Sequence, residues 1–239
     1  MRRSALFVFA ASMVALPAQA DQPPVVVELF TSQGCIACPP ADVVLNELAE
    51  DDNILALSWA VDYWDYLGWK DTFGSAKNTV RQENYNREFG QKGVYTPQMI
   101  INGRHQVIGS RKEDVLALVE RARAEKNLAR VTLSGDRTHL EVLIAGEAPK
   151  GQAVVRVIWY KSEEIVYIRN GDNRGKSLRY SNVVRGSIIM GRWDGNKVSL
   201  PIDLGPIIAS GADCVAIIVQ NGEFGPILGA AKLVFEPVI

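Results

Sequence analysis

The chain has 239 residues, and its 26 lysines and arginines nearly balance 27 aspartates and glutamates. This balance argues against the strongly basic surface of a nucleic-acid-binding protein or of a protein held on an anionic membrane. Three cysteines are too few for the disulfide scaffold of a small secreted domain.

The first 20 residues have the three parts of a secretory signal peptide. Arg2 and Arg3 precede an apolar run over residues 5–16, and Ala18-Gln19-Ala20 forms a small-residue cleavage site. The apolar run is about a dozen residues long, shorter than the roughly 20 that a transmembrane helix needs. We therefore expect cleavage after Ala20 and a periplasmic or secreted protein without stable membrane insertion.

The segment that follows predicts alternating strands and helices. Residues 25–30 are β-branched and almost wholly apolar, as in a strand that is covered on both faces. After a polar loop and two prolines, residues 41–50 show helical spacing, and proline is tolerated in a first helical turn. Residues 53–60 predict a second strand.

An aromatic and acidic stretch over residues 61–74 precedes a polar helix expected at 75–89, with Val80, Tyr85 and Phe89 as its apolar positions. Asn102-Gly103 then lies between two short strand-like runs, which is a strong signal for a hairpin. An amphipathic helix over residues 111–123 completes this part.

Beyond residue 128 the pattern changes to strands separated by glycine-rich turns. Strands are expected near 130–134, 139–144, 153–160, 164–168, 180–190, 197–203, 214–220 and 228–235. Their regular spacing is typical of an antiparallel sandwich. We therefore expect a signal peptide over residues 1–20, an α/β domain over 21–127 and an all-β, sandwich-like domain over 128–239.

Cys35 and Cys38 are the candidate reactive groups. A CxxC pair permits a small disulfide ring, and a helix N-terminus lowers the pKa of a thiol beside it. A structural zinc site would need further ligands, but the third cysteine, Cys214, lies in the other predicted domain and the chain has only two histidines. We expect neither a metal nor a dissociable cofactor.

The order of strand, CxxC, helix, strand, helix and Thr96-Pro97 before a hairpin resembles the thioredoxin superfamily. This resemblance implies a central mixed sheet flanked by helices, with Cys35 as the exposed attacking thiol and Cys38 as the resolving thiol. It also implies a cis bond before Pro97, so that the backbone of Thr96 is presented to an extended substrate.

The chain also resembles the DUF1223 family of exported bacterial proteins over nearly its whole mature length. The matching stretches are residues 27–35, 38–42, 61–64, 67–69, 81–82, 94–98, 171–176 and 182–184. This resemblance implies a thioredoxin-like fold followed by a β-rich domain. As two departures, Ala60 stands where family members usually carry a histidine, and the Ile-Ala dipeptide between the cysteines differs from that of thioredoxin.

Several further residues are candidates for the site. Glu28 lies in an apolar strand and is either a buried proton acceptor for Cys38 or a glutamate that faces solvent. Asp62 follows the second strand and either borders a substrate or caps the loop, while Tyr63 and Trp64 either form a substrate groove or fill the domain interface. Tyr95, next to Thr96, completes the candidate substrate-binding set.

We therefore expect an exported thiol-disulfide oxidoreductase that acts on protein or small-molecule thiols. One alternative is a binding module in which the same cysteines form a static disulfide. Another is a Cu(I)-handling protein, because paired thiolates bind soft metals, although the nearest methionines and histidines along the sequence are isolated.

Overall fold

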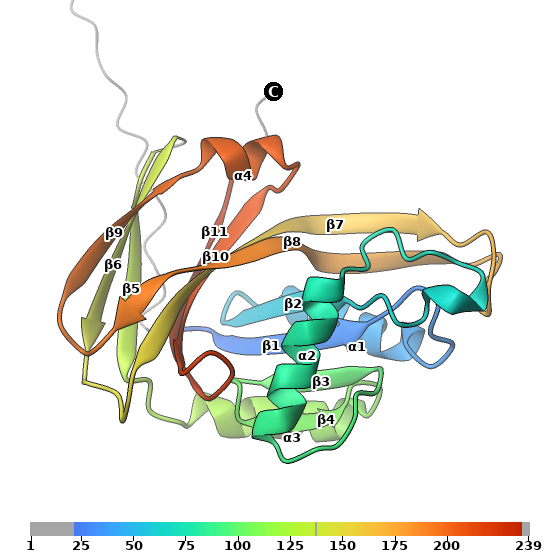
Figure 1. Ribbon diagram of the computed structural model, residues 1–239, viewed down its shortest axis with the longest axis horizontal. Helices are drawn as coiled ribbons and strands as arrows, with labels where there is room; N and C mark the ends of the chain where they lie inside the picture. The colour runs from blue at the N-terminus through green and yellow to red at the C-terminus, as the bar shows by residue number, and fades with distance from the viewer. Residues whose placement is uncertain (1–21, 137, 236–239) are drawn as a thin grey trace, which may run out of the picture.

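The computed structural model describes residues 22–136 and 138–235, so the predicted signal peptide lies outside the described residues. The chain forms a mixed α/β structure with a large central mixed sheet, a smaller sheet and few helices (Figure 1). The elements in chain order are β1 (Val25–Thr31), α1 (Pro39–Ala49), β2 (Ile54–Ala60), η1 (Asp65–Leu67), α2 (Ala76–Glu88), β3 (Gln98–Ile101), β4 (His105–Ile108), α3 (Lys112–Arg123), β5 (Ala129–Gly135), β6 (His139–Gly146), β7 (Ala153–Tyr167), β8 (Ser177–Trp193), β9 (Val198–Asp203), α4 (Gly205–Ala209), β10 (Cys214–Asn221) and β11 (Ile227–Val234).

The large sheet has eight strands in the order β11-β10-β7-β8-β2-β1-β3-β4. The N-terminal strands β1 to β4 and the C-terminal strands therefore belong to one sheet, joined where β8 runs parallel to β2 and Ser58 is paired with Val183. The side chain of Asn182 adds a hydrogen bond from its Nδ2 to the Ala56 carbonyl, at 2.8 Å. The strands before and after residue 128, where the sequence pattern changes, thus belong to one continuous sheet.

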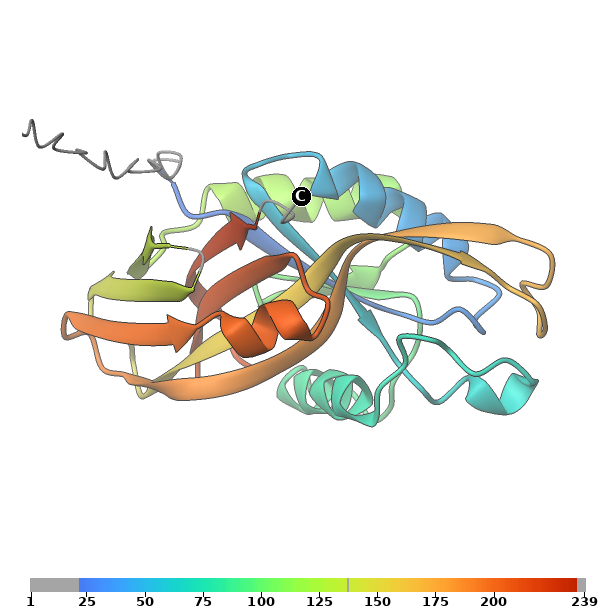
Figure 2. The same ribbon diagram turned by 90° about the horizontal axis from the view of Figure 1, so that it is seen from above.

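Helices cover the N-terminal strands on both faces (Figure 2). Helices α1 and α3 pack with alternate residues of β1, such as Val27 and Leu29, whereas Tyr85 of α2 packs with Val26 and Phe30 on the opposite face. The small sheet, in the order β5-β6-β9, shares a second core with β7, β10 and β11. None of the helices within residues 22–136 and 138–235 is long and apolar enough to span a membrane.

The elements follow the sequence pattern closely, with two differences in the C-terminal half. The strands expected at 153–160 and 164–168 are one strand, β7, because the polar residues between them pair with β8 in a long hairpin. The short helix α4, which begins at Gly205-Pro206, was not expected. It has only five residues, too few for helical periodicity to be recognised.

Helix α2 buries a polar face. Of the apolar positions that the sequence shows in this helix, Tyr85 is buried but Val80 is 51% exposed. The helix instead directs Arg81, Gln82 and Asn86 towards the sheet, where each finds a hydrogen-bonding partner. A buried polar group costs little when it is hydrogen-bonded, so a helix with few apolar residues still docks.

The predicted hairpin at Asn102-Gly103 is confirmed. The two residues lie in the three-residue connection from β3 to β4 and have positive φ angles of 47° and 62°, the combination that a tight hairpin turn requires. Asn102 also ties this turn to β1, since its Oδ1 accepts a hydrogen bond from the Val26 N–H at 2.8 Å.

Gly229 sets the distance between the two sheets. A Cβ atom at this position of β11 would lie 2.0 Å from the carbonyl oxygen of Ala129 in β5. We expect Gly229→Ala to lower the free energy of unfolding by roughly 1–3 kcal/mol, as overpacking usually does. Gly191→Ala is the matched control, because Gly191 also lies in a strand but a Cβ atom there would have no neighbour within 4 Å. Equal unfolding midpoints in denaturant for the two variants would contradict this assignment.

Candidate functional site

The candidate site is built on the turn between β1 and α1. Cys35 and Cys38 form a disulfide with a Cα–Cα distance of 5.4 Å, and Cys38 is the N-cap residue of α1. The N–H groups of Ala41 and Asp42 bond to the Cys38 carbonyl and start the helix, while Pro39 and Pro40 occupy its first turn. The predicted position of the pair at a helix N-terminus is confirmed.

Both sulfur-bearing residues are covered, which corrects one expectation. Cys35 was expected to be exposed, but it is 2% exposed, and Cys38 is 0% exposed. The two residues between them, Ile36 and Ala37, are exposed, Ile36 at 57%. The sequence could not reveal this burial, because the covering residues come from segments far along the chain.

One covering segment is the loop after η1. Asp71 accepts hydrogen bonds from the Gln33 N–H at 2.7 Å and from the Phe73 N–H at 2.8 Å. The Gln33 side chain in turn bonds to Trp69 Nε1 and to the hydroxyl of Thr72, both at 2.8 Å. The residues just before Cys35 are therefore fixed to residues 69–73 by side-chain and backbone contacts.

The other covering segment is the tip of the β7–β8 hairpin, residues 168–176. Asn173 is fully buried there, and its Nδ2 donates to the carbonyls of Gln33 and Cys35 at 2.9 and 3.0 Å. Lys176 donates to Asn173 Oδ1 at 2.8 Å and orients the amide. Both views show this tip beside the turn that precedes α1 (Figures 1 and 2). A residue of the C-terminal half thus contacts the backbone of Cys35.

The predicted aromatic residues lie next to the Thr96-Pro97 segment. Trp64 Nε1 donates to the Thr96 hydroxyl at 2.7 Å, and the Tyr63 hydroxyl donates to Gln82 Oε1 at 3.2 Å. The Cβ of Trp64 lies 3.2 Å from where a Cβ on Gly34 would be, so only glycine fits easily beside it. Trp64 therefore connects the residue before Cys35 to Thr96.

The Thr96-Pro97 peptide bond is cis, as the resemblance implied. Thr96 is half-buried, and Pro97 is buried at the start of β3. Tyr95 is also half-buried, and its hydroxyl lies 3.4 Å from Gln106 Oε1. Burial raises the pKa of Tyr63 to about 12, with bonds to Thr96 and Gln82 opposing the effect, so its phenol is neutral at physiological pH.

Asp62 is half-buried, and its carboxylate contacts helix α2. Its Oδ1 accepts from the Thr79 hydroxyl at 2.6 Å, which ties the end of β2 to the first turns of α2.

Tyr66, which stacks on Trp64 with ring centroids 6.4 Å apart, is the aromatic residue of this loop that is most exposed, at 76%.

Glu28 is fully buried, but its partners are not the cysteines. It forms an ion pair with Arg81, with Nε to Oε2 at 2.7 Å, and accepts from the Tyr85 hydroxyl at 2.6 Å. It lies on the α2 face of β1, whereas α1 packs on the opposite face. Its contacts therefore place it in a separate cluster.

Asp42 is the buried acid beside the cysteines that the sequence interpretation missed. It lies one turn after Cys38, is 5% exposed, and its Oδ1 accepts from the Thr31 hydroxyl at 2.8 Å. Its Oδ2 has no hydrogen-bonding partner among the described residues, and neither does the hydroxyl of buried Tyr180 in β8. An aspartate in a first helical turn usually faces solvent, so no sequence signal pointed to its burial.

Burial raises the pKa of Asp42 well above its ordinary value, and the nearby charge of Asp71 adds to this effect while the Thr31 bond opposes it. Burial also raises the pKa of Asp71, against the bonds it accepts from Gln33 and Phe73. Tyr180 has a raised pKa for the same reason, with further contributions from Asp42 and Asp71. The three groups therefore form a proton-retaining cluster behind the disulfide.

The third cysteine and metal-binding groups do not extend the site. Cys214 is a buried free thiol, and burial next to Asp213 raises its pKa to about 12. In the part of the chain that the structure describes, no group of three or more histidine, cysteine, aspartate or glutamate residues is placed to hold a metal ion.

Comparison with known proteins gives the family. A family described as a protein of unknown function, DUF1223, matches residues 26–220, which is most of the chain. The chain belongs to the DUF1223 family. No curated protein matches it.

Two solved structures are similar to this DUF1223 protein. A crystal structure of a protein from Agrobacterium tumefaciens is 32% identical with a TM-score of 0.78, and the match covers 92% of this chain and 97% of the other. HBP35 of Porphyromonas gingivalis is 14% identical with a TM-score of 0.61, over 93% of this chain and 81% of the other. At that identity the second similarity concerns the fold alone.

The raised pKa of Asp42 predicts a pH dependence of stability. The folded DUF1223 protein holds this proton more tightly than the unfolded chain, whose aspartates titrate near pH 3.9. Stability from this group is therefore fully present below about pH 3.9 and is lost as pH rises to the folded pKa. The amide that Asp42→Asn introduces does not titrate, so this variant does not lose stability in this way. As pH rises from the unfolded to the folded pKa of Asp42, the unfolding free energy of the variant should therefore increase relative to that of the wild type. The increase is about 1.4 kcal/mol for each pH unit that separates the two pKa values.

Urea unfolding from about pH 3.5 to 8 with the disulfide intact measures this difference. Asp172→Asn, a substitution at an exposed aspartate of the hairpin tip, is the control and should keep the wild-type pH dependence. If Asp42→Asn also follows the wild type at every pH, Asp42 is not a proton-retaining group.

Proposed function

We propose that this DUF1223 protein is an exported enzyme of thiol-disulfide exchange. In this proposal, residues 21–127 are a thioredoxin-like domain that carries the reaction, and residues 128–239 are an all-β, sandwich-like domain. The observation that carries the proposal is the Cys35–Cys38 disulfide at the N-terminus of α1, next to Trp64 and Thr96. A helix N-terminus stabilises a thiolate, which is the leaving group when such a disulfide opens.

The oxidised protein reacts with a substrate that carries two thiols. A substrate thiolate attacks Sγ of Cys35, the Cys35–Cys38 bond breaks, and Cys38 leaves as a thiolate. The second substrate thiolate then attacks the substrate sulfur of the mixed disulfide and releases Cys35. The substrate loses two electrons and forms a disulfide, while Cys35 and Cys38 take up those electrons and two protons. The same steps in reverse reduce a substrate disulfide.

The surrounding residues have separate roles in this proposal. The backbone of Tyr95 and Thr96 binds an extended substrate at the entrance to β3. Tyr63 and Trp64 provide the apolar surface on which the substrate packs. The hydrogen bond from Trp64 to Thr96 fixes this surface relative to the substrate-binding backbone. Glu28 supports this site only indirectly, since its carboxylate is occupied by Arg81 and Tyr85.

The burial of both cysteines favours a second candidate, a binding module with a static disulfide. Asn173 and Asp71 fix the turn around Cys35, the residue that a substrate must reach, and Cys35 is only 2% exposed. The two candidates differ in accessibility: exchange requires the tip of the β7–β8 hairpin to move, whereas a static disulfide requires it to stay.

Serine variants test the reaction directly. Cys35→Ser should abolish exchange with glutathione, whereas Cys38→Ser should trap a mixed disulfide on Cys35, detected by mass spectrometry. Cys214→Ala is the control and should keep the wild-type rate, since a buried thiol with a pKa of about 12 is not nucleophilic. Exchange that survives in Cys35→Ser would refute the proposal, and a redox potential below about −300 mV would favour the static disulfide.

Removal of the Asn173 amide tests whether the hairpin tip limits access. Asn173→Ala should speed the reaction of the disulfide with dithiothreitol roughly fivefold or more, because a typical hydrogen bond contributes about 1 kcal/mol. Asp172→Ala changes the neighbouring exposed residue and should leave the rate unchanged. Equal rates for both variants and the wild type would show that the tip does not control access to the disulfide.

A further inference from the structure

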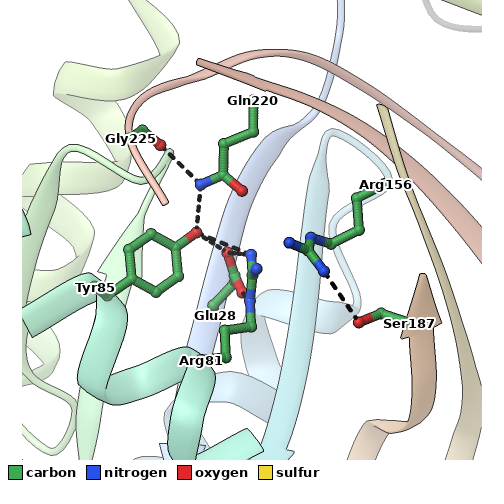
Figure 3. A network of polar contacts seen from close by, with 7 residues as sticks. All are labelled: Glu28, Arg81, Tyr85, Arg156, Ser187, Gln220 and Gly225. Carbon is green, nitrogen blue, oxygen red and sulfur yellow. Dashed lines mark hydrogen bonds and ion pairs between the residues drawn. The ribbon is translucent and has the colours of Figure 1, made fainter. Parts of the chain in front are cut away.

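A buried polar cluster lies on the α2 face of the large sheet, apart from the cysteines. Figure 3 shows its side chains converging from strands β1, β7, β8 and β10 and from α2. Its members are Glu28, Arg81, Tyr85, Arg156, Ser187, Gln220 and the backbone of Gly225. The surrounding layer is apolar and includes Trp59, Ile158 and Ile218.

The single carboxylate of this cluster is already occupied. Arg81 donates to Glu28 from Nε at 2.7 Å and from Nη2 at 2.9 Å, and Tyr85 donates at 2.6 Å. Burial lowers the pKa of Arg81, but the charge of Glu28 outweighs this and raises it above the ordinary value. Glu28 and Arg81 therefore neutralise each other as a bidentate pair.

Arg156 brings a second positive charge into the same layer. It is 8% exposed, and its one hydrogen bond, from Nη1 to the Ser187 hydroxyl, is long at 3.5 Å. Its Nε has no partner among the described residues, and the same is true of Nη1 of Arg81. Glu223, the other acidic residue whose charge acts on Arg156, lies exposed on the turn between β10 and β11.

Arg156 does not remove this second positive charge by losing its proton. Burial and the charge of Arg81 lower the pKa of Arg156 to about 10, which leaves it charged at physiological pH. Two guanidinium groups with one carboxylate leave an excess of one positive charge among apolar side chains. Unpaired charges in a protein interior are destabilising, so a counter-charge at this position would stabilise the fold.

We propose that a small inorganic monoanion of the size of chloride binds between Arg81 and Arg156. Figure 3 shows the guanidinium of Arg156 directed towards that of Arg81, and their two unpartnered N–H groups are the donors that such an anion accepts. The Ser187 hydroxyl, which accepts from Nη1 of Arg156, lies on the side of that guanidinium away from Arg81. The anion neutralises the cluster and holds β7 and β8 against α2. This proposal is independent of the thiol chemistry.

A water molecule is the competing occupant, because Gln220 Oε1 is a buried acceptor that also has no partner among the described residues. Water would bridge Gln220 to an arginine but would leave the excess charge unbalanced. An anion makes the stability of the full protein depend on its concentration, whereas water does not.

Thermal unfolding in chloride tests the proposal. Chloride replaces gluconate from about 5 to 500 mM at constant sodium concentration, and the wild-type Tm should rise by at least about 2 °C. Arg156→Gln should lose this dependence, while Arg130→Gln, at an exposed arginine of β5, should keep it. A wild-type Tm that does not change, or an Arg156→Gln dependence equal to that of the wild type, would overturn the proposal.

Crystals of the wild-type protein soaked in sodium bromide give a second readout that does not depend on any variant folding. An anomalous peak within about 3.5 Å of Arg156 Nε and of an Arg81 nitrogen is expected. An ordered density without anomalous signal at this position would identify water and overturn the proposal.

Discussion

The pairing of β8 with β2 is the interaction on which the rest of the structure depends. It is short, with Ser58 opposite Val183, yet it extends the sheet of the N-terminal half into the C-terminal half. Because β8 lies beside β2, the residues just before Val183 pass over α1, and Asn46 of α1 accepts a hydrogen bond from the Ser181 N–H at 2.9 Å. The pairing of β8 with β2 therefore determines where the tip of the β7–β8 hairpin lies relative to Cys35.

The same strand creates the chemical surroundings of the cysteines. Tyr180 lies over the first turns of α1, and its burial accompanies that of Asp42. The placement of β8 thus brings Asn173 to the backbone of Cys35 and Tyr180 to the side of Asp42.

The local pattern of the sequence predicted the elements well. The CxxC pair at a helix start, the Asn102-Gly103 turn and most strands depend on contacts within a few residues, and the structure has them at the expected places. Burial was predicted less well. The exposure of Cys35 was misjudged because its burial depends on contacts with Asn173, about 140 residues away, and the buried polar face of α2 could not be predicted because its partners lie on other elements.

The partners and burial of the ionisable groups were also hard to predict from the sequence. Glu28 was recognised as a candidate buried acid because an isolated charge in an apolar strand is conspicuous, but its partners Arg81 and Tyr85 come from a helix that looks like a polar surface helix. Asp42 and Arg156 gave no such signal, since both are ordinary residues for a helix start and a strand. Their significance depends on which strands become neighbours.

The burial of Cys214 bears on how the chain acquires its correct cross-link. Cys35 and Cys38 are three residues apart, so closing their ring requires little loss of chain entropy, whereas a ring to Cys214 would enclose most of the protein. Once β10 is inserted between β7 and β11, the third thiol is sealed inside the sheet. In the folded chain the third thiol is therefore shielded both from the Cys35–Cys38 pair and from a second molecule.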